Sequence, residues 1–309
     1  MADILVTGGA GFIGSHTVEL LLRKGYSVVV LDNFRTGEIS NINHLAGKIK
    51  IVQGDVRDEK LLSEIVKNID GIIHLAAVVS VDEAIERPKE AFEINGIGTL
   101  NLLELARKYD IENFVYASSA AVYGDPIEIP ISENHPLNPK NPYGASKLSA
   151  EMLVNSYRET YGLKTISLRY FNVYGPRMKL GPYAGAVIKF VSAALKNKKI
   201  TIFGDGNQIR DLIYVSDVAR ANIIALEKNE TGVFNVGTGK GTKIIDVARR
   251  IIELTKSKSE ITYTPPRPGD IRESVANIEK ITTKLKWKPT VTLEMGLKLT
   301  INFEKAKNK

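Results

Sequence analysis

The chain has 309 residues, of which 43% are hydrophobic and 25% are charged, and it contains no cysteine. That length and composition suit a globular protein with one large or two modest domains. The absence of cysteine excludes disulfides, thiolate metal ligands and a cysteine nucleophile, and the four histidines include no H-x-x-x-H pair, so we expect no metal site. Because no apolar run reaches membrane-spanning length and no signal-peptide pattern opens the chain, we expect a soluble, cytoplasmic protein.

The formal net charge is +7, from 42 Lys and Arg against 35 Asp and Glu. A basic balance can serve nucleic acid or a phosphorylated small substrate. Here the basic residues are spread along the chain, without an RNA-binding aromatic motif or zinc-finger spacing. We interpret the charge as a solvated Lys-rich surface and expect no nucleic-acid and no membrane partner.

Short apolar segments alternate with helical patterns in the first half of the chain. We expect strands at residues 3–7, 27–31, 49–52, 71–74, 113–117 and 164–169, and helices at about 12–24, 58–68, 88–108 and from Tyr143 onward. Such βαβ repetition predicts an α/β fold with a doubly wound parallel (Rossmann) sheet, whose ligands bind beyond the carboxyl ends of the strands. We interpret His74, at the end of an apolar strand, as a core histidine with satisfied hydrogen bonds.

After Arg169 the pattern changes. Residues 171–177 look like a loop; strands are expected at 200–203, 210–214 and 233–236, and helices at about 183–196, 216–228, 242–256, 277–285 and 293–307. We therefore expect a dinucleotide-binding domain over 1–170 and a smaller α/β substrate lobe over 171–309, with the segment at about 210–236 a candidate to rejoin the first sheet. The Pro-rich stretch 265–270 suits a binding loop, and the cleft between the halves is the expected site.

A glycine-rich turn joins the first expected strand to the first expected helix. Gly8, Gly11 and Gly14 form a variant of the dinucleotide-binding fingerprint in the strand–turn–helix context that it requires. Small residues let the backbone approach a pyrophosphate, which the helix N-terminus attracts. Asp32, ending the second strand, can bind the adenosine ribose and would repel a 2′-phosphate, which favours NAD over NADP; Arg35 lies close enough to weaken that preference. The alternative is a plain glycine turn with a strand-capping Asp.

Tyr143 and Lys147 lie four residues apart in the stretch 142–147, which begins a helical pattern with a proline. On a helix they share one face, and an ammonium beside a phenol would lower its pKa and make it a proton acceptor for a sugar hydroxyl. Alone, the pattern also fits an exposed lysine beside a half-buried tyrosine.

Motifs in a fixed order extend these signals. They occupy residues 7–16 (TGGAGFIGSH), 31–33 (LDN), 54–58 (GDVRD), 74–77 (HLAA), 95 with 98–99, 118–124 (SSAAVYG), 142–147 (PYGASK), 169–177 (RYFNVYGPR), 210–211 (RD) and 267–270 (RPGD). Over essentially its whole length the chain resembles the extended short-chain dehydrogenase/reductases, and among them the UDP-glucose 4-epimerases and their nucleotide-sugar relatives.

The resemblance implies an NAD cofactor and a set of site residues. It assigns catalysis to Ser119, Tyr143 and Lys147. It assigns cofactor binding to Gly8, Gly11, Phe12, Ile13, Gly14, Asp32, Asn33, Phe34, Arg35, Thr36, Gly37, Asp55, Val56, Leu75, Ala76, Ala77, Asn95, Ser119, Tyr143, Lys147 and Phe171. It assigns binding of a UDP-sugar to Ser80, Ser119, Tyr143, Asn172, Ala186, Val187, Thr201, Ile202, Phe203, Arg210, Arg267, Asp270 and Ser274. A homodimer through helices near 88–108 and 143–161 is implied as well.

The residues after Ser119 separate the reactions that this scaffold supports. Related dehydratases carry Asp-Glu there and related decarboxylases a Glu, whereas this chain has Ala120-Ala121. Without that carboxylate, the expected reaction is reversible hydride transfer, which epimerises C4 of a UDP-hexose in galactose metabolism. An epimerase of UDP-glucuronate or a dTDP-sugar, and a non-catalytic NAD-binding protein, remain the alternatives.

Two departures from the family pattern bear on this expectation. Some epimerases carry a lysine shortly after the HLAA motif, where this chain has Val78-Val79-Ser80. The position four residues after Asp270, bulky in some epimerases, is Ser274, which would leave room for an N-acetyl group. We therefore expect activity on UDP-GlcNAc and UDP-GalNAc as well.

Overall fold

The computed structural model describes residues 2–181, 184–266 and 271–307. Its centre is a seven-stranded sheet with the order β10-β6-β5-β4-β1-β2-β3, in which every neighbouring pair is parallel. The strands are β1 (Asp3–Thr7), β2 (Ser27–Asp32), β3 (Lys50–Gln53), β4 (Gly71–His74), β5 (Asn113–Ser119), β6 (Thr165–Tyr170) and β10 (Gly232–Val236). The expected doubly wound fold is confirmed. Strand order reverses between β1 and β4, which places a crevice at their carboxyl ends.

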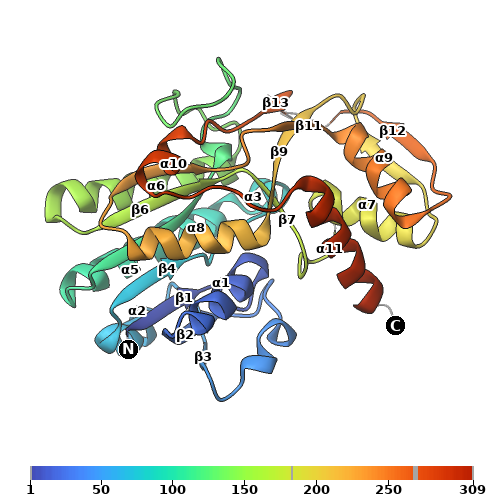
Figure 1. Ribbon diagram of the computed structural model, residues 1–309. Helices are drawn as coiled ribbons and strands as arrows, with labels where there is room; N and C mark the ends of the chain where they lie inside the picture. The colour runs from blue at the N-terminus through green and yellow to red at the C-terminus, as the bar shows by residue number, and fades with distance from the viewer. Residues whose placement is uncertain (1, 182–183, 267–270, 308–309) are drawn as a thin grey trace.

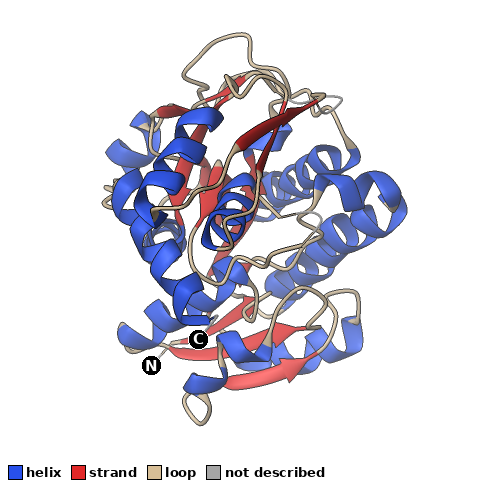
Figure 2. Ribbon diagram, turned by 90° about the vertical axis from the view of Figure 1, so that its right-hand side faces the viewer, coloured by secondary structure: helices blue, strands red, loops and turns tan. Residues whose placement is uncertain are grey.

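Helices cover both faces of this sheet (Figures 1 and 2). On one face α1 (Phe12–Arg23) and α8 (Val215–Glu227) lie side by side; on the other α2 (Glu59–Ile65), α5 (Gly98–Lys108) and α6 (Pro142–Tyr161) pack together. Short 3-10 turns follow β2 (Ile39–Asn41, Asn43–Leu45), α2 (Val66–Asn68) and β5 (Ala120–Val122). Because both faces are covered, the central strands are nearly continuous runs of buried residues.

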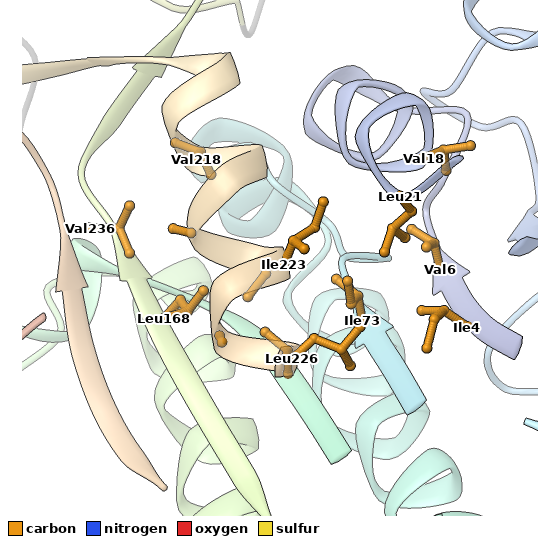
Figure 3. Packing of buried hydrophobic residues seen from close by; sticks show 14 of the residues in the cluster. Ile4, Val6, Val18, Leu21, Ile73, Leu168, Val218, Ile223, Leu226 and Val236 are labelled. Carbon is orange, nitrogen blue, oxygen red and sulfur yellow. The ribbon is translucent and has the colours of Figure 1, made fainter. Parts of the chain in front are cut away.

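The side chains of each central strand alternate between two buried layers. On β1, Ile4 and Val6 belong to the layer under α1 and α8, whereas Leu5 belongs to the layer under α2, α5 and α6. Figure 3 shows the first layer, with Val18 and Leu21 of α1 and Val218, Ile223 and Leu226 of α8 against Ile73, Leu168 and Val236 of the sheet. Burial of each such side chain stabilises the fold by about 1.5–3 kcal/mol. This layer therefore fixes α8, from late in the chain, on the first sheet.

The chain is helical over 88–108, as expected, but one turn of this helix is a π turn. The structure has α3 (Val81–Glu86), α4 (Pro88–Phe92), a π-helical turn η4 (Glu93–Ile97) and then α5. The π turn points Asn95 inward, where it is 1% exposed. The predicted extent of the helix is confirmed, whereas its π turn was not predicted, because apolar periodicity does not distinguish a short π turn from an α-helix.

The second half builds a smaller lobe around β9 (Ile209–Tyr214). Strand β9 pairs with β7, β11 and β13, and β8 pairs with β12 in a separate sheet. The remaining strands are β7 (Asn172–Tyr174), β8 (Ile200–Phe203), β11 (Gly241–Lys243), β12 (Ile261–Thr264) and β13 (Glu273–Ser274), and the helices are α7 (Ala186–Leu195), α9 (Ile244–Thr255), α10 (Glu279–Lys284) and α11 (Leu293–Lys307). Figure 1 shows α7, α9 and α11 beside the main sheet.

Two sequence-based expectations for this half are wrong. The expected loop 171–177 contains β7, because its three residues pair with the end of β9, a long-range contact that no local pattern indicates. The expected helix at about 242–256 begins only at Ile244, since 241–243 pairs with β9 as β11. Of the segment 210–236, α8 and β10 lie on the first sheet and β9 lies in the second lobe.

None of the helices in the described ranges combines the length and the apolarity needed to cross a bilayer.

Candidate active site

Helix α6 presents the two candidate catalytic side chains of the 142–147 stretch at the carboxyl end of β5. Asn141 caps the helix, since its Oδ1 accepts a hydrogen bond from Gly144 N at 2.9 Å, and Pro142 takes the first position, where no N–H is needed. Tyr143 is half-buried and Lys147, one turn later on the same face, is 4% exposed. The exposed-lysine interpretation is therefore wrong.

Ser119 ends β5 and meets Tyr143 across the gap between strand and helix. The two hydroxyl groups are hydrogen-bonded, and Ser119 Oγ also accepts a bond from Ala121 N at 3.2 Å. The Lys147 Nζ lies 4.7 Å from the centroid of the Tyr116 ring, and it forms no hydrogen bond with any residue that the structure describes. Ser119, Tyr143 and Lys147 thus converge at one end of the sheet.

The electrostatics of this group differ from the expectation. Burial raises the pKa of Tyr143, and the hydrogen bond with Ser119 opposes that rise. Burial also lowers the pKa of Lys147 to about 7, with the charge of Glu151 opposing the change. The predicted lowering of the Tyr143 pKa by Lys147 is therefore wrong for the protein alone, because burial disfavours both charged forms.

The Gly-rich turn forms a close-packed cradle at the carboxyl end of β1. Gly8 has φ +69°, and a Cβ there would lie 2.8 Å from Ala76 N. A Cβ at Gly14 would lie 2.1 Å from Gly8 O. Thr7 Oγ1 accepts hydrogen bonds from Leu75 N and Ala76 N, both at 3.2 Å, which joins the turn to the end of β4. A backbone this tightly packed, at the start of α1, fits a pyrophosphate group.

Asp32 lies beside this cradle, at the end of β2. Its two oxygens accept hydrogen bonds from Ala10 N at 2.9 Å and Phe34 N at 2.8 Å. Burial raises the pKa of Asp32, and these two bonds oppose the rise. A Cβ at Gly37 would lie 2.8 Å from Asp32 Oδ1. The carboxylate is therefore held in one place, as binding of a ribose hydroxyl requires.

The residues predicted to border the adenine follow β2 and β3. Asn33 Nδ2 donates to Asp55 Oδ2 at 3.0 Å. The hydrogen bond from Arg57 lowers the pKa of Asp55 to about 2, so that this carboxylate is charged at neutral pH. Val56 packs closely against the first residue of α5, because a Cβ added at Gly98 would lie 2.4 Å from the Val56 side chain. The structure thus gathers the predicted adenosine-end residues at the neighbouring ends of β2 and β3.

Asn95 joins the chain after β4 to helix α6. Its Oδ1 accepts a bond from Val78 N at 2.8 Å, and its Nδ2 donates to Val78 O at 3.1 Å and to Ser146 Oγ at 2.8 Å. Nearby, the ring nitrogens of His74 bond to the hydroxyls of Thr7 at 2.7 Å and Thr99 at 2.9 Å, which confirms its interpretation as a satisfied core residue.

The remaining first-half candidates have simpler surroundings. Ser80 caps α3 by accepting a hydrogen bond from Glu83 N at 3.1 Å. Phe171 is buried behind β6, and Thr36 is exposed. Phe12 and Ile13 begin α1, and Ala77 follows β4 beside the cradle.

The described substrate candidates of the second half come from four strands, β7, β8, β9 and β13, and from the start of α7. In the β9–β13 pairing Arg210 lies beside Ser274, and Asn172 is exposed at the start of β7. Thr201 and Phe203 are exposed on β8, whereas Ile202 and, at the start of α7, Val187 are buried in the lobe's core. Ala186 opens α7. Arg267 and Asp270 lie outside the described residues.

An open pocket of about 690 Å³ lies beside β8 and β12. Its lining consists of Gly204, Asp205, Gln208, Tyr263, Thr264, Pro266 and Arg272. Pro266 belongs to the Pro-rich stretch that the sequence predicts as a binding loop, and Phe203, a predicted substrate residue, directly precedes Gly204. The other lining residues were not predicted as site residues. Within this lining Arg272 is paired with Asp205, since its Nη1 and Nη2 donate to Asp205 Oδ1 at 2.8 Å and Oδ2 at 3.1 Å, and the Tyr263 ring offers a face for stacking.

The profile of the family described as GDP-mannose 4,6 dehydratase matches residues 5–300. The chain belongs to that family, among the extended short-chain dehydrogenase/reductases.

Its similarity to individual members of the extended family covers nearly the whole chain. A Methanocaldococcus jannaschii protein named putative UDP-glucose 4-epimerase is 44% identical over 309 residues, covering 99% of each chain. The crystal structure of UDP-glucose 4-epimerase with UDP-glucose from Thermotoga maritima has a TM-score of 0.96 and 40% identity, covering 99% of this chain and 100% of that one. The Thermus thermophilus UDP-glucose 4-epimerase complex with NAD has a TM-score of 0.92 and 39% identity, covering 98% and 99%.

One buried network in this extended dehydrogenase/reductase was missed by the sequence reasoning. Glu151 and Arg169 form a fully buried ion pair, with Oε1–Nη2 at 2.5 Å and Oε2–Nε at 3.0 Å. Ser118 Oγ donates to the same carboxylate at 2.5 Å, and Arg169 Nη1 donates to Tyr123 Oη at 2.9 Å. Two features of the sequence could have indicated this pair. Glu151 lies four residues after Lys147 on α6, and so on the same helix face, and Arg169 is a charged residue within the apolar pattern of β6.

Asp211, which the sequence analysis includes in the 210–211 motif without a role, is 0% exposed next to Arg210. Its carboxylate accepts bonds from Thr238 N at 2.7 Å, Thr238 Oγ1 at 2.6 Å, Gly239 N at 2.9 Å and Ala276 N at 3.2 Å. It therefore joins β9, the turn after β10 and the chain after β13.

Proposed function

We propose that the protein is an NAD-dependent epimerase that inverts C4 of UDP-hexoses, interconverting UDP-glucose and UDP-galactose. The observation that carries this proposal is the convergence of Ser119, Tyr143 and Lys147 beside the Gly8 cradle, followed by two alanines in place of an acid. The 3-10 turn Ala120–Val122 supplies no carboxylate next to the reacting position. The similarity to UDP-glucose 4-epimerases supports the same reaction.

The cofactor would lie along the crevice between β1 and β4. The Gly8 cradle and the start of α1 would hold its pyrophosphate, and Asp32 would accept hydrogen bonds from the adenosine ribose. Asn33, Asp55 and Val56 would border the adenine. When bound, NAD supplies the hydride acceptor that makes C4 oxidation reversible.

Proton transfer at the sugar's O4 falls to Tyr143. Ser119 donates a hydrogen bond to that oxygen and keeps it within reach of the phenol. Because burial raises the pKa of Tyr143, the phenolate requires a nearby positive charge, and Lys147 is the buried cation on its own helix face. After the sugar has turned over in the site, Tyr143 would return the proton to O4, and the bound cofactor would supply the hydride for the other face of C4.

The second lobe would hold the nucleotide. Arg210 is placed to pair with the diphosphate, since guanidinium–phosphate bonds are charge-assisted and strong. Ser274 beside it is small, and we expect it to admit an N-acetyl sugar as well. Cytoplasmic location and a role in galactose metabolism are part of the same proposal.

A homodimer completes the proposal. Apolar side chains are unusually exposed along α3, α4, η4 and α6, namely Ile85 at 55%, Phe92 at 39%, Ile97 at 50% and Met152 at 44%. Phe92 and Ile97 line an open pocket of about 470 Å³ between α4, η4 and α6. Exposed apolar side chains on neighbouring helices favour burial against a second copy. Analytical ultracentrifugation should give twice the chain mass; a monomer at micromolar concentration would contradict it.

The deciding experiment mixes the purified protein with UDP-galactose, without added NAD, and follows UDP-glucose by chromatography. Appearance of UDP-glucose, at a final ratio independent of the starting epimer, supports both the reaction and a retained cofactor. The same assay on UDP-glucuronate and dTDP-glucose tests the alternative substrates. No conversion of any of these sugars, by protein that holds NAD, would overturn the proposal.

A further inference from the structure

Arg35 is the residue that left the choice between NAD and NADP open in the sequence, and the structure shows it engaged. Its Nη2 lies 2.5 Å from Glu83 Oε1 and 3.1 Å from Glu90 Oε2, and its Nη1 lies 2.8 Å from Glu90 Oε1. The Arg35 side chain is 28% exposed, and those of Glu83 and Glu90 are 16% and 31% exposed. Two carboxylates thus enclose one partly buried guanidinium.

These ion pairs lie across the cofactor crevice. Arg35 follows β2, whereas Glu83 and Glu90 belong to α3 and α4, which follow β4. In the sheet, β1 lies between β2 and β4, and the Gly8 cradle is at its carboxyl end. A side chain that reaches from the β2 side to the β4 side therefore passes the adenosine end of the crevice.

The start of this connection is fixed close to the ribose-binding position. Phe34 N donates to Asp32 Oδ1 at 2.8 Å, and Arg35 N donates to Asn33 Oδ1 at 3.1 Å, which folds residues 32–35 into a tight turn. Arg35 could consequently reach a phosphate on the ribose if its guanidinium were free. The other arginine at this end, Arg57, is engaged by Asp55 at 2.8 Å.

The two cofactors make opposite demands on this site. The 2′-hydroxyl of NAD needs an acceptor, which Asp32 supplies. The 2′-phosphate of NADP carries close to two negative charges and needs a cation, commonly an arginine, to bind well. With Arg35 held by two glutamates, that cation is not offered to a phosphate beside Asp32.

We propose that Glu83 and Glu90 are specificity-determining residues that exclude NADP by holding Arg35 away from the 2′-phosphate. This inference rests on the proposed NAD dependence and adds a second barrier to the repulsion by Asp32. It assigns a function to two residues on α3 and α4 that would touch neither the sugar nor the nicotinamide.

The test measures which cofactor the full-length protein holds. The protein is equilibrated with an equimolar mixture of NAD and NADP, freed of unbound nucleotide, and its extracted cofactors are quantified by chromatography. In the double variant Glu83→Gln/Glu90→Gln the bound NADP-to-NAD ratio should rise about tenfold, the size of one charge-assisted hydrogen bond. Because the readout is bound cofactor and not turnover, failure of this inference is distinct from failure of the epimerase assay.

Two further variants make the result specific. Asp82→Asn removes one negative charge from α3 at a side chain that does not contact Arg35, and it should leave the ratio unchanged. Adding Arg35→Ala to the double variant should cancel the gain. An unchanged ratio in the double variant, or a gain that survives the loss of Arg35, would overturn the inference. Glu90→Gln alone, a milder change at a half-exposed site, should give a smaller rise in the same direction.

Discussion

The two halves of the molecule hold their candidate site residues by different means. In the first half most of the residues lie at or just after the strand ends of one sheet, and Tyr143 and Lys147 lie on α6, which packs on that sheet. Two continuous buried layers set the positions of these elements. In the second half Arg210, Ser274 and Phe203 come from short strands in two small sheets, and the hydrogen bonds of one carboxylate, Asp211, hold several segments together. We therefore expect changes in the first half to alter the chemistry or the fold, and changes in the second to alter affinity and selectivity.

The largest effect should come from Tyr143→Phe. Loss of the phenol removes the proton acceptor, so turnover of UDP-galactose should fall by about 10²–10⁴-fold. The apolar ring remains, so the melting temperature and the content of bound cofactor should stay near those of the wild type. Steady-state rates and cofactor extraction check both parts, and substantial turnover by this variant would refute the proposed role of Tyr143.

Glu151→Gln should lower the stability of the fold more than it lowers the turnover rate. It leaves Arg169 as a buried charge with no carboxylate partner, which costs about 3–5 kcal/mol. Urea unfolding measures this loss. The control Glu159→Gln, in an exposed pair with Arg158, should change stability by less than about 1 kcal/mol. Equal effects of the two variants would mean that the buried pair does not anchor α6 to β6.

Lys147→Met tests the cost of burying the catalytic ammonium. Because the folded-state pKa of Lys147 lies near 7 and the unfolded value near 10.5, the unfolded chain binds more protons between these pH values. The lysine therefore destabilises the fold below about pH 7, and this penalty declines as pH rises toward 10.5. The variant should be about 1–3 kcal/mol more stable at pH 7, after allowing for the lost contact with Tyr116, yet much less active.

Urea unfolding of wild type and Lys147→Met at pH 7 and pH 10 measures that difference. The stability gain should shrink at pH 10. A gain that is constant between the two pH values would show that charge burial is not its cause.

Asp211→Asn extends the comparison to the second lobe. An amide cannot accept all the bonds that the carboxylate accepts, so stability should fall by about 1–3 kcal/mol. Since Arg210 and the chain after Ser274 would shift, KM for UDP-galactose should rise severalfold with kcat less affected. The exposed Asp246→Asn is the matched control. A fall in kcat with KM unchanged would contradict the division between the halves.

The smallest effect should come from Ser274→Tyr. A bulky side chain next to Arg210 should reduce turnover of UDP-GlcNAc by about tenfold and leave UDP-galactose turnover nearly unchanged, since it removes space and no bond to the smaller sugar. Parallel assays on the two sugars measure this, with Ser274→Ala as control. If N-acetyl turnover is unaffected, the predicted role of this position in selectivity is wrong.

The first half was readable from the sequence because its signals are local. Short apolar strands, the spacing of Gly8, Gly11 and Gly14, and the proline and asparagine at the start of α6 each act within a few residues. The strands of the second lobe were less readable, since β7, β11 and β13 have two or three residues each and exist through pairing with β9. The π turn at 93–97 was not predicted for a similar reason. Its Asn95 is held by hydrogen bonds with Val78 and Ser146, which are distant in the chain.

By itself, the sequence determined the doubly wound fold and which polar residues end its strands, because both follow from local periodicity and spacing. Only the tertiary structure decided the charge state of those residues. Burial raises the pKa of Tyr143 and lowers that of Lys147, and the Glu151–Arg169 pair lies beneath them. Arg35, ambiguous in the sequence, is held by Glu83 and Glu90 from beyond the next strand. Desolvation and ion pairing depend on neighbours far along the chain, and those neighbours are known only once the chain has folded.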